Sequence, residues 1–375
     1  MPRVVQKYCC SMQKVSAKEC VELLCRLVAT PSVSGAEQGT ADILYAFLAE
    51  RGAEVNRLHN NVWSIAAGFD ASKPTLLLNS HHDTVKPAGG YTFDPYSGAI
   101  EDGKILGLGS NDAGGSAVSL IALFSNFSDT TTLPFNLILA ITAEEETMGE
   151  RGMRAMLAHF AELGIKIDMA IVGEPTDMQA AIGERGLVVL DGVATGKSGH
   201  AARAEGDNAL YKAVEDIALL RGYRFENVSQ VLGEIKVSVT QIAAGTQHNI
   251  VPDCCRYVVD VRTTDAYTNE QTAALLQAAV KHSTLTPRST RVRASAISTA
   301  HPLVRAAIAV GRECFISPTT SDRALMSGIA ALKIGVGQSS RSHTADEFVK
   351  ISEIEQGIEI YCSILKEMSK YETLE

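Results

Sequence analysis

The sequence predicts an α/β fold in which a smaller α+β domain interrupts a larger sheet domain. In residues 15–184, and again in 298–375, short aliphatic runs such as 135–141 and 167–172 alternate with helical patterns. Such runs are typical of strands that helices bury on both faces. Residues 185–297 instead alternate apolar and polar side chains, which is typical of strands with one exposed face. The change of pattern therefore predicts domain boundaries at 184/185 and 297/298.

The large domain begins with two capped helices. Ser16 and Glu19 form a capping box that opens the first helix, and Ser34 and Glu37 form a second box that opens the next. Residues 1–14 precede these helices and are expected to be a leader that belongs to no core. The other elements expected here are strands at 55–67, 75–78, 135–141 and 167–172 and helices at 117–124 and 151–163.

The inserted region has the element order β-α-β-β-α-β, which predicts a four-stranded sheet with two helices on one face. Its expected elements are strands at 187–195, 234–241, 255–262 and 291–297, a helix at 208–220, and a second helix capped by Thr268. The buried pattern then returns with a helix at 303–310, a strand at 331–336 and a long terminal helix.

Composition excludes several classes of protein. The 375-residue chain has a formal net charge of −9 and no block rich in Lys and Arg, which argues against a nucleic-acid surface. No apolar stretch approaches the roughly 18 residues of a membrane helix, and no secretory signal is present at the start. The eight cysteines form no C-x-x-C pair. We therefore expect reduced cysteines in a cytoplasmic protein.

Possible metal ligands follow four of the predicted buried strands. They are His81 and Asp83, Glu144 to Glu146, Glu174, and His343 in the loop after the last strand. Ligands in open α/β sheets bind outside the carboxyl ends of the strands, so these residues are expected to converge. Alone, an acidic run is more often a solvated turn, and a histidine after a strand is more often a hydrogen-bonded loop residue. The joint pattern favours a metal site.

The type and number of these residues indicate a pair of divalent ions. Asp112 adds a further carboxylate from a glycine-rich loop before a buried helix. Imidazoles combined with carboxylates suit zinc or a similar ion and not calcium. Five ligand candidates exceed the three that one ion needs, so two ions sharing a carboxylate, about 3.5–4 Å apart, are expected. Asp83 is placed to accept the other ring N–H of His81.

Seven short motifs carry a resemblance to a known family. They are Ser80-His81-His82-Asp83-Thr84-Val85, Gly107-Leu108-Gly109-Ser110-Asn111-Asp112, Thr142-Ala143-Glu144-Glu145-Glu146, Gly173-Glu174-Pro175-Thr176, Gly199-His200, Asn249-Ile250-Val251-Pro252 and Ser342-His343-Thr344-Ala345-Asp346-Glu347. The sequence resembles the co-catalytic zinc amidohydrolases and exopeptidases, which include acetylornithine deacetylase, succinyl-diaminopimelate desuccinylase, aminoacylase and glutamate carboxypeptidase. Members more often have Asp where this chain has Glu144.

The resemblance implies a fold and a set of ligands. It implies a zinc-exopeptidase-like catalytic domain with helices on both sheet faces, and an inserted ferredoxin-like domain that acts as a lid and makes a homodimer. It implies two zinc ions per chain, with cobalt or manganese as substitutes. The implied ligands are His81, Asp112 and Glu174 on one ion, and Asp112, Glu146 and His343 on the other.

The resemblance also implies roles for residues that bind no metal. Glu145 would be the general base and Asp83 the residue that orients His81. His200 would reach the active site of the partner subunit, and Arg262 and Asn249 would hold the substrate's carboxylate. The alternative for these last two is an exposed strand arginine and a turn asparagine. Asp346 and Glu347 are expected to fix the loop that carries His343.

The activity implied is hydrolysis of the amide bond of an N-acylated amino acid. The first substrate expected is N-acetylornithine, cleaved to ornithine and acetate in arginine biosynthesis. The alternatives are N-acetyl- or N-succinyl-citrulline, N-succinylornithine, succinyl-diaminopimelate and a dipeptide. From another class, the chain would be a non-catalytic homologue that binds a small acid. The complete ligand set and Glu145 argue against that alternative.

Overall fold

The computed structural model describes residues 12–371, which divide into two compact units. The large unit runs to Ile182 and continues through Ile297–Phe315 and from Ser321 onward, and the small unit comprises Gly183–Ala296 and Ile316–Thr320. These breaks lie beside those expected from the strand patterns, and the structure adds the short segment Ile316–Thr320 to the small unit.

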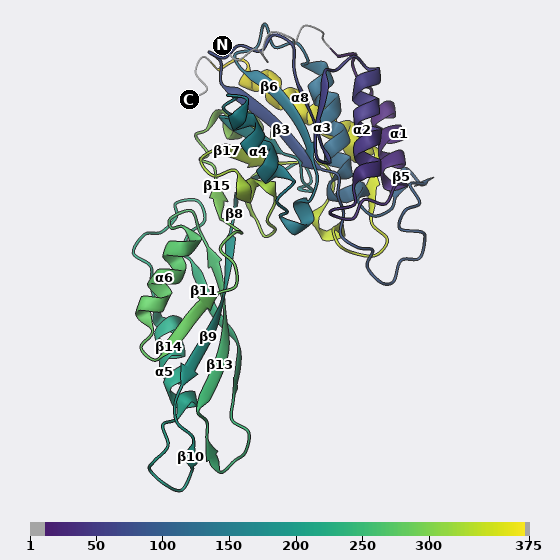
Figure 1. The fold of residues 1–375 in the computed structure, drawn as a ribbon. Helices are drawn as coiled ribbons and strands as arrows, with labels where there is room; N and C mark the ends of the chain where they lie inside the picture. The colour runs from purple at the N-terminus through teal and green to yellow at the C-terminus, as the bar shows by residue number, and fades with distance from the viewer. Residues whose placement is uncertain (1–11, 372–375) are drawn as a thin grey trace. The chain divides into compact units, whose positions relative to one another are not determined.

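The large unit is built on a mixed sheet whose central strands are parallel (Figure 1). Its strands, in spatial order, are β1 (Val55–Leu58), β2 (Asn61–Ile65), β6 (Asn136–Thr142), β3 (Thr75–His81), β7 (Met169–Val172), β17 (Ala330–Lys333) and β8 (Ala180–Glu184), with β16 (Cys314–Ser317) beside β8. The neighbours β6, β3, β7 and β17 pair in parallel. Their carboxyl ends therefore meet at one edge of the sheet.

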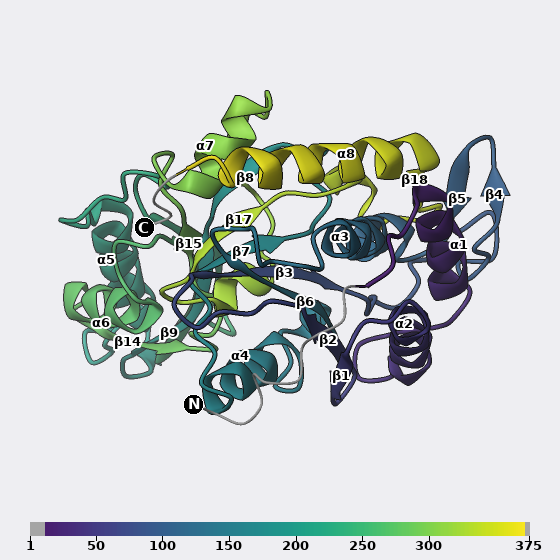
Figure 2. The same ribbon diagram turned by 90° about the horizontal axis from the view of Figure 1, so that it is seen from above.

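Helices cover both faces of this sheet (Figure 2). One face packs against α1 (Ala17–Val28), α3 (Gly115–Asn126), α7 (Pro302–Ala309) and α8 (Ile351–Met368), and the other against α4 (Met153–Glu162). Successive residues of a strand point to opposite faces. Leu76 and Leu78 of β3 accordingly join the first core while Leu77 joins the second, and all three are fully buried. Double burial explains the continuous aliphatic runs.

Smaller elements complete the large unit. They are the three-stranded sheet of β4 (Ile100–Glu101), β5 (Lys104–Leu106) and β18 (Phe348–Lys350), and the helical turns Ser110–Gly114, Glu145–Thr147, Asp322–Leu325 and Ser339–Arg341. The 13-residue helix α2 (Gln38–Glu50) packs into the first core through Leu44, Phe47 and Leu48. No helix in residues 12–371 is both long enough and apolar enough to cross a bilayer.

The two predicted capping boxes have different outcomes. The box of Ser16 and Glu19 is confirmed at the start of α1. The box of Ser34 and Glu37 is wrong, although the helix is present, because α2 begins at Gln38 without a side-chain cap. The Ser34 hydroxyl donates instead to the buried Asp83 carboxylate at 2.7 Å, and a hydrogen bond to a charged acceptor is stronger than the neutral bond of a cap.

The predicted leader lies mostly outside the described residues, which begin at Met12. Met12 is 5% exposed and belongs to the main core, and the Gln13 N–H donates to the Arg51 carbonyl. The expectation that residues up to 14 contact no core is therefore wrong at Met12. The predicted strand at 55–67 is also two strands, β1 and β2, because His59 adopts a positive φ of 54° and turns the chain back.

The small unit has the element order predicted for it. Its sheet order is β11 (Lys236–Ala244), β13 (Cys254–Thr263), β9 (Gly186–Thr195) and β14 (Ser283–Pro287), and its helices are α5 (Ala209–Gly222) and α6 (Asn269–Ala279). Apolar residues on one face of the sheet, among them Val188, Leu190 and Val259, form a core with both helices. Two short strands, β10 (Gly199–His200) and β12 (Ile250–Val251), pair separately.

The prediction for the fourth strand of this sheet is wrong. Residues 291–297 contribute only the two-residue strand β15 (Ser295–Ala296), which pairs with Gly183 and Glu184 of β8. Residues 283–287 pair with β9 instead, because Ser283 and Leu285 alternate inward and Leu285 packs into the core.

Candidate dinuclear metal site

His81 lies at the carboxyl end of β3 with an unpaired ring nitrogen. Its side chain is 1% exposed, and its Nδ1 lies 3.0 Å from the Asp83 carbonyl oxygen. The Nε2 atom is buried and makes no hydrogen bond within residues 12–371. Three carboxylates face it, with Asp112 Oδ1 at 3.5 Å, Glu174 Oε1 at 3.7 Å and Glu145 Oε2 at 3.9 Å. Such a buried nitrogen fits a metal ligand.

Asp112 faces both imidazoles that the sequence singled out. Its Oδ1 lies 3.5 Å from His81 Nε2, and its Oδ2 lies 3.6 Å from His343 Nε2. His343 in turn lies 3.0 Å from Glu146 Oε2. One carboxylate between two nitrogen ligands is the arrangement that a shared bridging ligand requires. The structure therefore brings together residues from four separate parts of the chain.

The loop that carries Asp112 is held by a buried carboxylate. Glu347 is 1% exposed, and its Oε1 accepts from the Asn111 N–H at 2.9 Å and the Asp112 N–H at 3.0 Å. The same loop passes close to the residue after Asp83, since a Cβ on Gly109 would lie 2.6 Å from the Thr84 methyl carbon. The Glu347 carboxylate therefore holds the loop of Asp112, and its expected role in the loop that carries His343 stays a prediction.

The three carboxylates of the acidic run Glu144-Glu145-Glu146 point in two directions. Glu144 has a positive φ of 56°, and its carboxylate accepts from Arg151 Nε at 2.8 Å. The turn that follows is anchored by Asp83, whose carboxylate accepts from the Glu145 N–H at 3.0 Å and the Glu146 N–H at 3.2 Å. Glu145 and Glu146 thus face the cluster while Glu144 pairs outside it.

The electrostatics of the cluster follow from burial and close charges. Burial raises the pKa of Glu145 well above its ordinary value, and the charge of Glu174 adds to the effect. Burial lowers the pKa of His81, but the contacts with Asp112 and Asp83 outweigh it and raise that pKa well above the ordinary value. The crowding of carboxylates around the imidazoles favours positive charge at this place, and a bound cation would meet the same need.

The side chains present fit a pair of divalent ions. The ligand atoms of His81, Glu145 and Glu174 lie within 4.8 Å of one another, and so do those of His81, Asp112 and Glu146, so His81 belongs to both groups. The second imidazole, His343, joins through its contacts with Asp112 at 3.6 Å and Glu146 at 3.0 Å. Imidazole nitrogens mixed with carboxylate oxygens suit zinc, cobalt or manganese. Glu145, expected to be the base, lies in the first of these groups, so the substitution Glu145→Gln distinguishes a base from a ligand.

The remaining predicted residues lie in the small unit. His200 and Asn249 come together at the pair β10–β12, where the Ala201 N–H donates to the Asn249 carbonyl at 2.9 Å. Arg262 lies near the far end of the ten-residue strand β13, and its Nε donates to Asp260 Oδ1 at 2.9 Å. Within one small unit the structure brings His200 and Asn249 together and leaves Arg262 apart. Their roles stay predictions.

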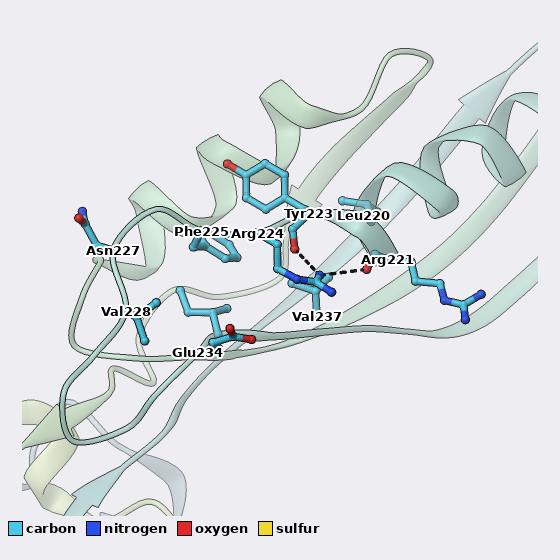
Figure 3. A pocket seen from close by; sticks show the side chains of 10 residues that line it. Leu220, Arg221, Tyr223, Arg224, Phe225, Asn227, Val228, Glu234 and Val237 are labelled. Atoms are coloured by element: carbon cyan, nitrogen blue, oxygen red, sulfur yellow. Dashed lines mark hydrogen bonds between the residues drawn. The ribbon is translucent and has the colours of Figure 1, made fainter.

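The small unit also has a hollow at the end of α5, with a volume of about 80 Å³ (Figure 3). Tyr223, Phe225 and Val237 line it, and Arg224 folds back to donate to the carbonyls of Arg221 and Tyr223. Its ten lining residues include one acid and neither histidine nor cysteine. It is therefore no second metal site.

Asp322 is a buried acid that sequence reasoning missed. It is 3% exposed and accepts from Thr142 Oγ1 at 2.8 Å, beneath the end of β6. Burial raises its pKa to about 6. A single acid between Ser321 and Arg323 looks like a turn, and no aliphatic run leads into it, so the sequence offered no signal.

Comparison with known proteins agrees with this geometry. The sequence profile of "Peptidase family M20/M25/M40" matches residues 77–367, most of the chain. The chain belongs to this family. It is 30% identical over 378 residues to "Succinyl-diaminopimelate desuccinylase" of Dinoroseobacter shibae, covering 92% of this chain and 98% of that protein. It is 27% identical over 359 residues to the protein of that name from Stenotrophomonas maltophilia, covering 89% and 95%.

Solved structures of M20 proteins share the fold. Aminopeptidase PepT from Bacillus cereus has a TM-score of 0.73 at 19% identity, covering 94% of this chain and 99% of that one. A protein of Bacillus subtilis described as a dinuclear metal binding peptidase of the M20 family has a TM-score of 0.67 at 14% identity, covering 94% and 98%. The M20 family and its ligand cluster make this chain a metal-dependent amide hydrolase, as the motifs predicted.

Proposed function

We propose that this M20 enzyme removes the acyl group of an N-acylated amino acid, with two zinc ions per chain and N-acetylornithine as the first substrate. The observation that supports this best is the Asp112 carboxylate, which faces His81 at 3.5 Å and His343 at 3.6 Å beside the half-buried Glu145. A shared carboxylate next to a basic one is what hydrolysis by a two-ion site needs.

The residues proposed to hold the ions divide into two sets. They are His81, Asp112 and Glu174 for one ion, and Asp112, Glu146 and His343 for the other. When bound, the two ions would supply electrophilic assistance to the amide carbonyl and would lower the pKa of a water between them.

Glu145 carries the proton transfers in this proposal. It accepts a proton from the attacking water as the oxygen–carbon bond forms, and it delivers that proton to the leaving nitrogen as the carbon–nitrogen bond breaks. The products are a carboxylate from the acyl group and a free amine. The Glu145 Oε2 lies 3.9 Å from His81 Nε2, which places the carboxylate beside an atom proposed to bind an ion.

A second substrate has direct support from the relatives. The Dinoroseobacter shibae and Stenotrophomonas maltophilia proteins are both named succinyl-diaminopimelate desuccinylase. We therefore place succinyl-diaminopimelate beside N-acetylornithine in the substrate tests. The six cysteines of the described residues are free, which supports a cytoplasmic location for either activity.

An acyl-release assay decides among these substrates. The zinc-loaded protein is given acetyl- and succinyl-ornithine, acetyl- and succinyl-citrulline, succinyl-diaminopimelate and a dipeptide, and the freed amine is measured. We expect release from one of the acylated amino acids, about two zinc ions per chain, and loss of release on chelation. Binding of these acids without turnover, with both ions present, would instead establish the non-catalytic alternative.

We further propose that the small unit makes a homodimer in which His200 serves the partner's site, and that Arg262 and Asn249 hold the substrate's carboxylate. Mixed dimers test this, because His200→Ala and Glu145→Ala would each be inactive alone. If His200 acts in trans, the mixed dimer contains one site with an intact Glu145 and a His200 supplied by the other chain. Mixing should therefore restore activity. Full activity of a monomer, or no restoration in verified mixed dimers, would refute the role in trans.

A further inference from the structure

Ser34 makes a contact with the candidate site that the motifs did not predict. The buried Asp83 carboxylate has four close neighbours. Its Oδ1 accepts from the Glu145 N–H at 3.0 Å and faces His81 Nδ1 at 3.4 Å. Its Oδ2 accepts from the Glu146 N–H at 3.2 Å and from the Ser34 hydroxyl at 2.7 Å. The Ser34 bond is the shortest of these and comes from outside the cluster.

The backbone around Ser34 holds that hydroxyl in place. Val33 forms a parallel bridge with Thr84, the residue after Asp83. The Ser34 N–H donates to the Thr84 carbonyl at 3.2 Å, and the Thr84 N–H donates to the Ser32 carbonyl at 2.9 Å. The segment before α2 therefore runs beside Asp83. The Ser34 hydroxyl reaches Asp83 Oδ2 from a backbone that these hydrogen bonds hold in place.

The turn after Ser34 is fixed as well. Glu37 is fully buried, and its carboxylate accepts from the Gly35 N–H and from Asn60 Nδ2, the latter at 3.0 Å. The same segment is tied to the strand end by Thr40, whose hydroxyl lies 2.8 Å from His82 Nδ1. Ser34 is thus part of a pre-ordered segment, and its bond to Asp83 costs little further ordering on folding.

The position of the carboxylate matters because it acts on two groups at once. A rotation of the Asp83 carboxylate would move the acceptor for the Glu145 N–H and change the distance to His81 Nδ1. Small misplacements of a catalytic group have large effects on turnover. A charge-assisted bond of 2.7 Å from a fixed hydroxyl opposes such a rotation.

We infer that Ser34 is a positioning residue for this hydrolase: its hydroxyl fixes Asp83, and through Asp83 both the His81 imidazole and the turn that carries Glu145. The inference rests on the proposed function. It predicts a loss in turnover rather than in substrate binding, because Ser34 touches the residue that orients the base and not a residue proposed to hold the substrate.

The test compares Ser34→Ala, Ser34→Thr and the control Ser64→Ala. The control deletes a buried hydroxyl that bonds the Glu54 carbonyl at 2.9 Å, remote in sequence from the proposed ligands. We expect Ser34→Ala to lower kcat about tenfold with KM within about twofold, and to weaken Co²⁺ binding about threefold to tenfold, since residues that orient ligands affect both. Ser34→Thr, which keeps the hydroxyl, should recover most of each loss, and Ser64→Ala should change neither.

A double-mutant comparison shows whether the effect passes through Asp83. Adding Ser34→Ala to Asp83→Asn should weaken Co²⁺ binding no further than Asp83→Asn alone. A Ser34→Ala protein with unchanged kcat and Co²⁺ affinity, a failure of Ser34→Thr to rescue, or additive losses in the double variant would each overturn the inference. A wild-type protein that binds Co²⁺ but hydrolyses no compound of the panel would refute the proposed function alone, because the Co²⁺ comparison still tests Ser34.

Discussion

Replacement of Glu145 by glutamine tests whether this residue is the base or a metal ligand. The Glu145 Oε2 lies 3.9 Å from His81 Nε2, and its carboxylate falls in one group of possible ligand atoms with His81 and Glu174. Glutamine keeps the shape and the backbone N–H that Asp83 holds, but its amide accepts no proton near neutral pH. The substitution therefore removes proton transfer and leaves the turn in place.

The expected size of the effect follows from what a positioned base contributes. General acid–base catalysis supplies about 10²–10⁴-fold, which corresponds to about 2.7–5.5 kcal/mol at 1.36 kcal/mol for each factor of ten. We expect Glu145→Gln to lower kcat by that factor and to leave KM within about threefold. Release of free amine gives both constants, and metal analysis of the same sample should still find about two ions per chain.

Glu144→Gln is the matched control, since it makes the same change one residue away. The Glu144 carboxylate pairs with Arg151 at 2.8 Å outside the cluster, so kcat should change less than about threefold. A Glu145→Gln protein that keeps more than a tenth of wild-type kcat would refute the assignment of the base. Loss of one ion from that variant would show instead that Glu145 is a ligand.

Three further predictions concern stability. Glu347→Ala should lower the free energy of unfolding by about 2–4 kcal/mol in urea, because two buried N–H groups lose their acceptor, while Glu347→Gln, which keeps an acceptor oxygen, should lose less than half of that. Hydrogen bonds from Ser16 hold the pKa of Glu19 at about 2, below its ordinary 4.5. The contribution of Glu19 to the free energy of unfolding is therefore present above pH 4.5 and is lost as the pH falls through 2. Because Glu19 is 35% exposed, solvent screens its interactions, and Glu19→Gln should reduce the change in unfolding free energy across that pH window by only about 0.5 kcal/mol. An unchanged pH dependence of the unfolding free energy would contradict this. Tyr361→Phe should cost about 1–2 kcal/mol in the same urea assay, because the buried hydroxyl donates to the Ile334 carbonyl at 2.6 Å, and a neutral result would contradict this.

The large sheet was predictable because double burial leaves a strong pattern in the sequence. A strand such as β3 is buried along its whole length and carries an aliphatic run, Leu76 to Leu78, and its ligand lies where the strand ends. His81 and Glu174 could therefore be located from the runs that precede them. The fourth strand of the small unit was misplaced because residues 283–287 end in proline and bury only Ser283 and Leu285, a weak signal beside the longer alternation at 291–297.

The contacts around the ligands were the part that sequence could not supply. Ser34 and Asp83 are 49 residues apart, and no local sequence pattern predicts the hydrogen bond between them. The S-x-x-E spacing at Ser34 even favoured a different use, because a hydroxyl three residues before a glutamate is what a capping box requires. Asp322 was missed for a related reason, since its partner Thr142 lies 180 residues earlier. Long-range hydrogen bonds depend on which distant segments the fold brings together, so they can be identified only from the three-dimensional structure.

Three buried acids that lie beside the cluster share one physical task. Asp83 accepts from the backbone of Glu145 and Glu146, Glu347 accepts from the backbone of Asp112, and Asp322 accepts from Thr142 at the strand end before the acidic turn. Each therefore holds the chain segment that presents a ligand or the base. Segments crowded with carboxylates repel one another, and short turns have few apolar contacts with which to resist that repulsion. A buried carboxylate that accepts N–H or hydroxyl bonds supplies this restraint, and those bonds occupy oxygen lone pairs that could otherwise bind an ion. The sequence motifs named the acids proposed to bind metal, but they did not show Asp322 or the bonds by which Asp83 and Glu347 hold the neighbouring segments.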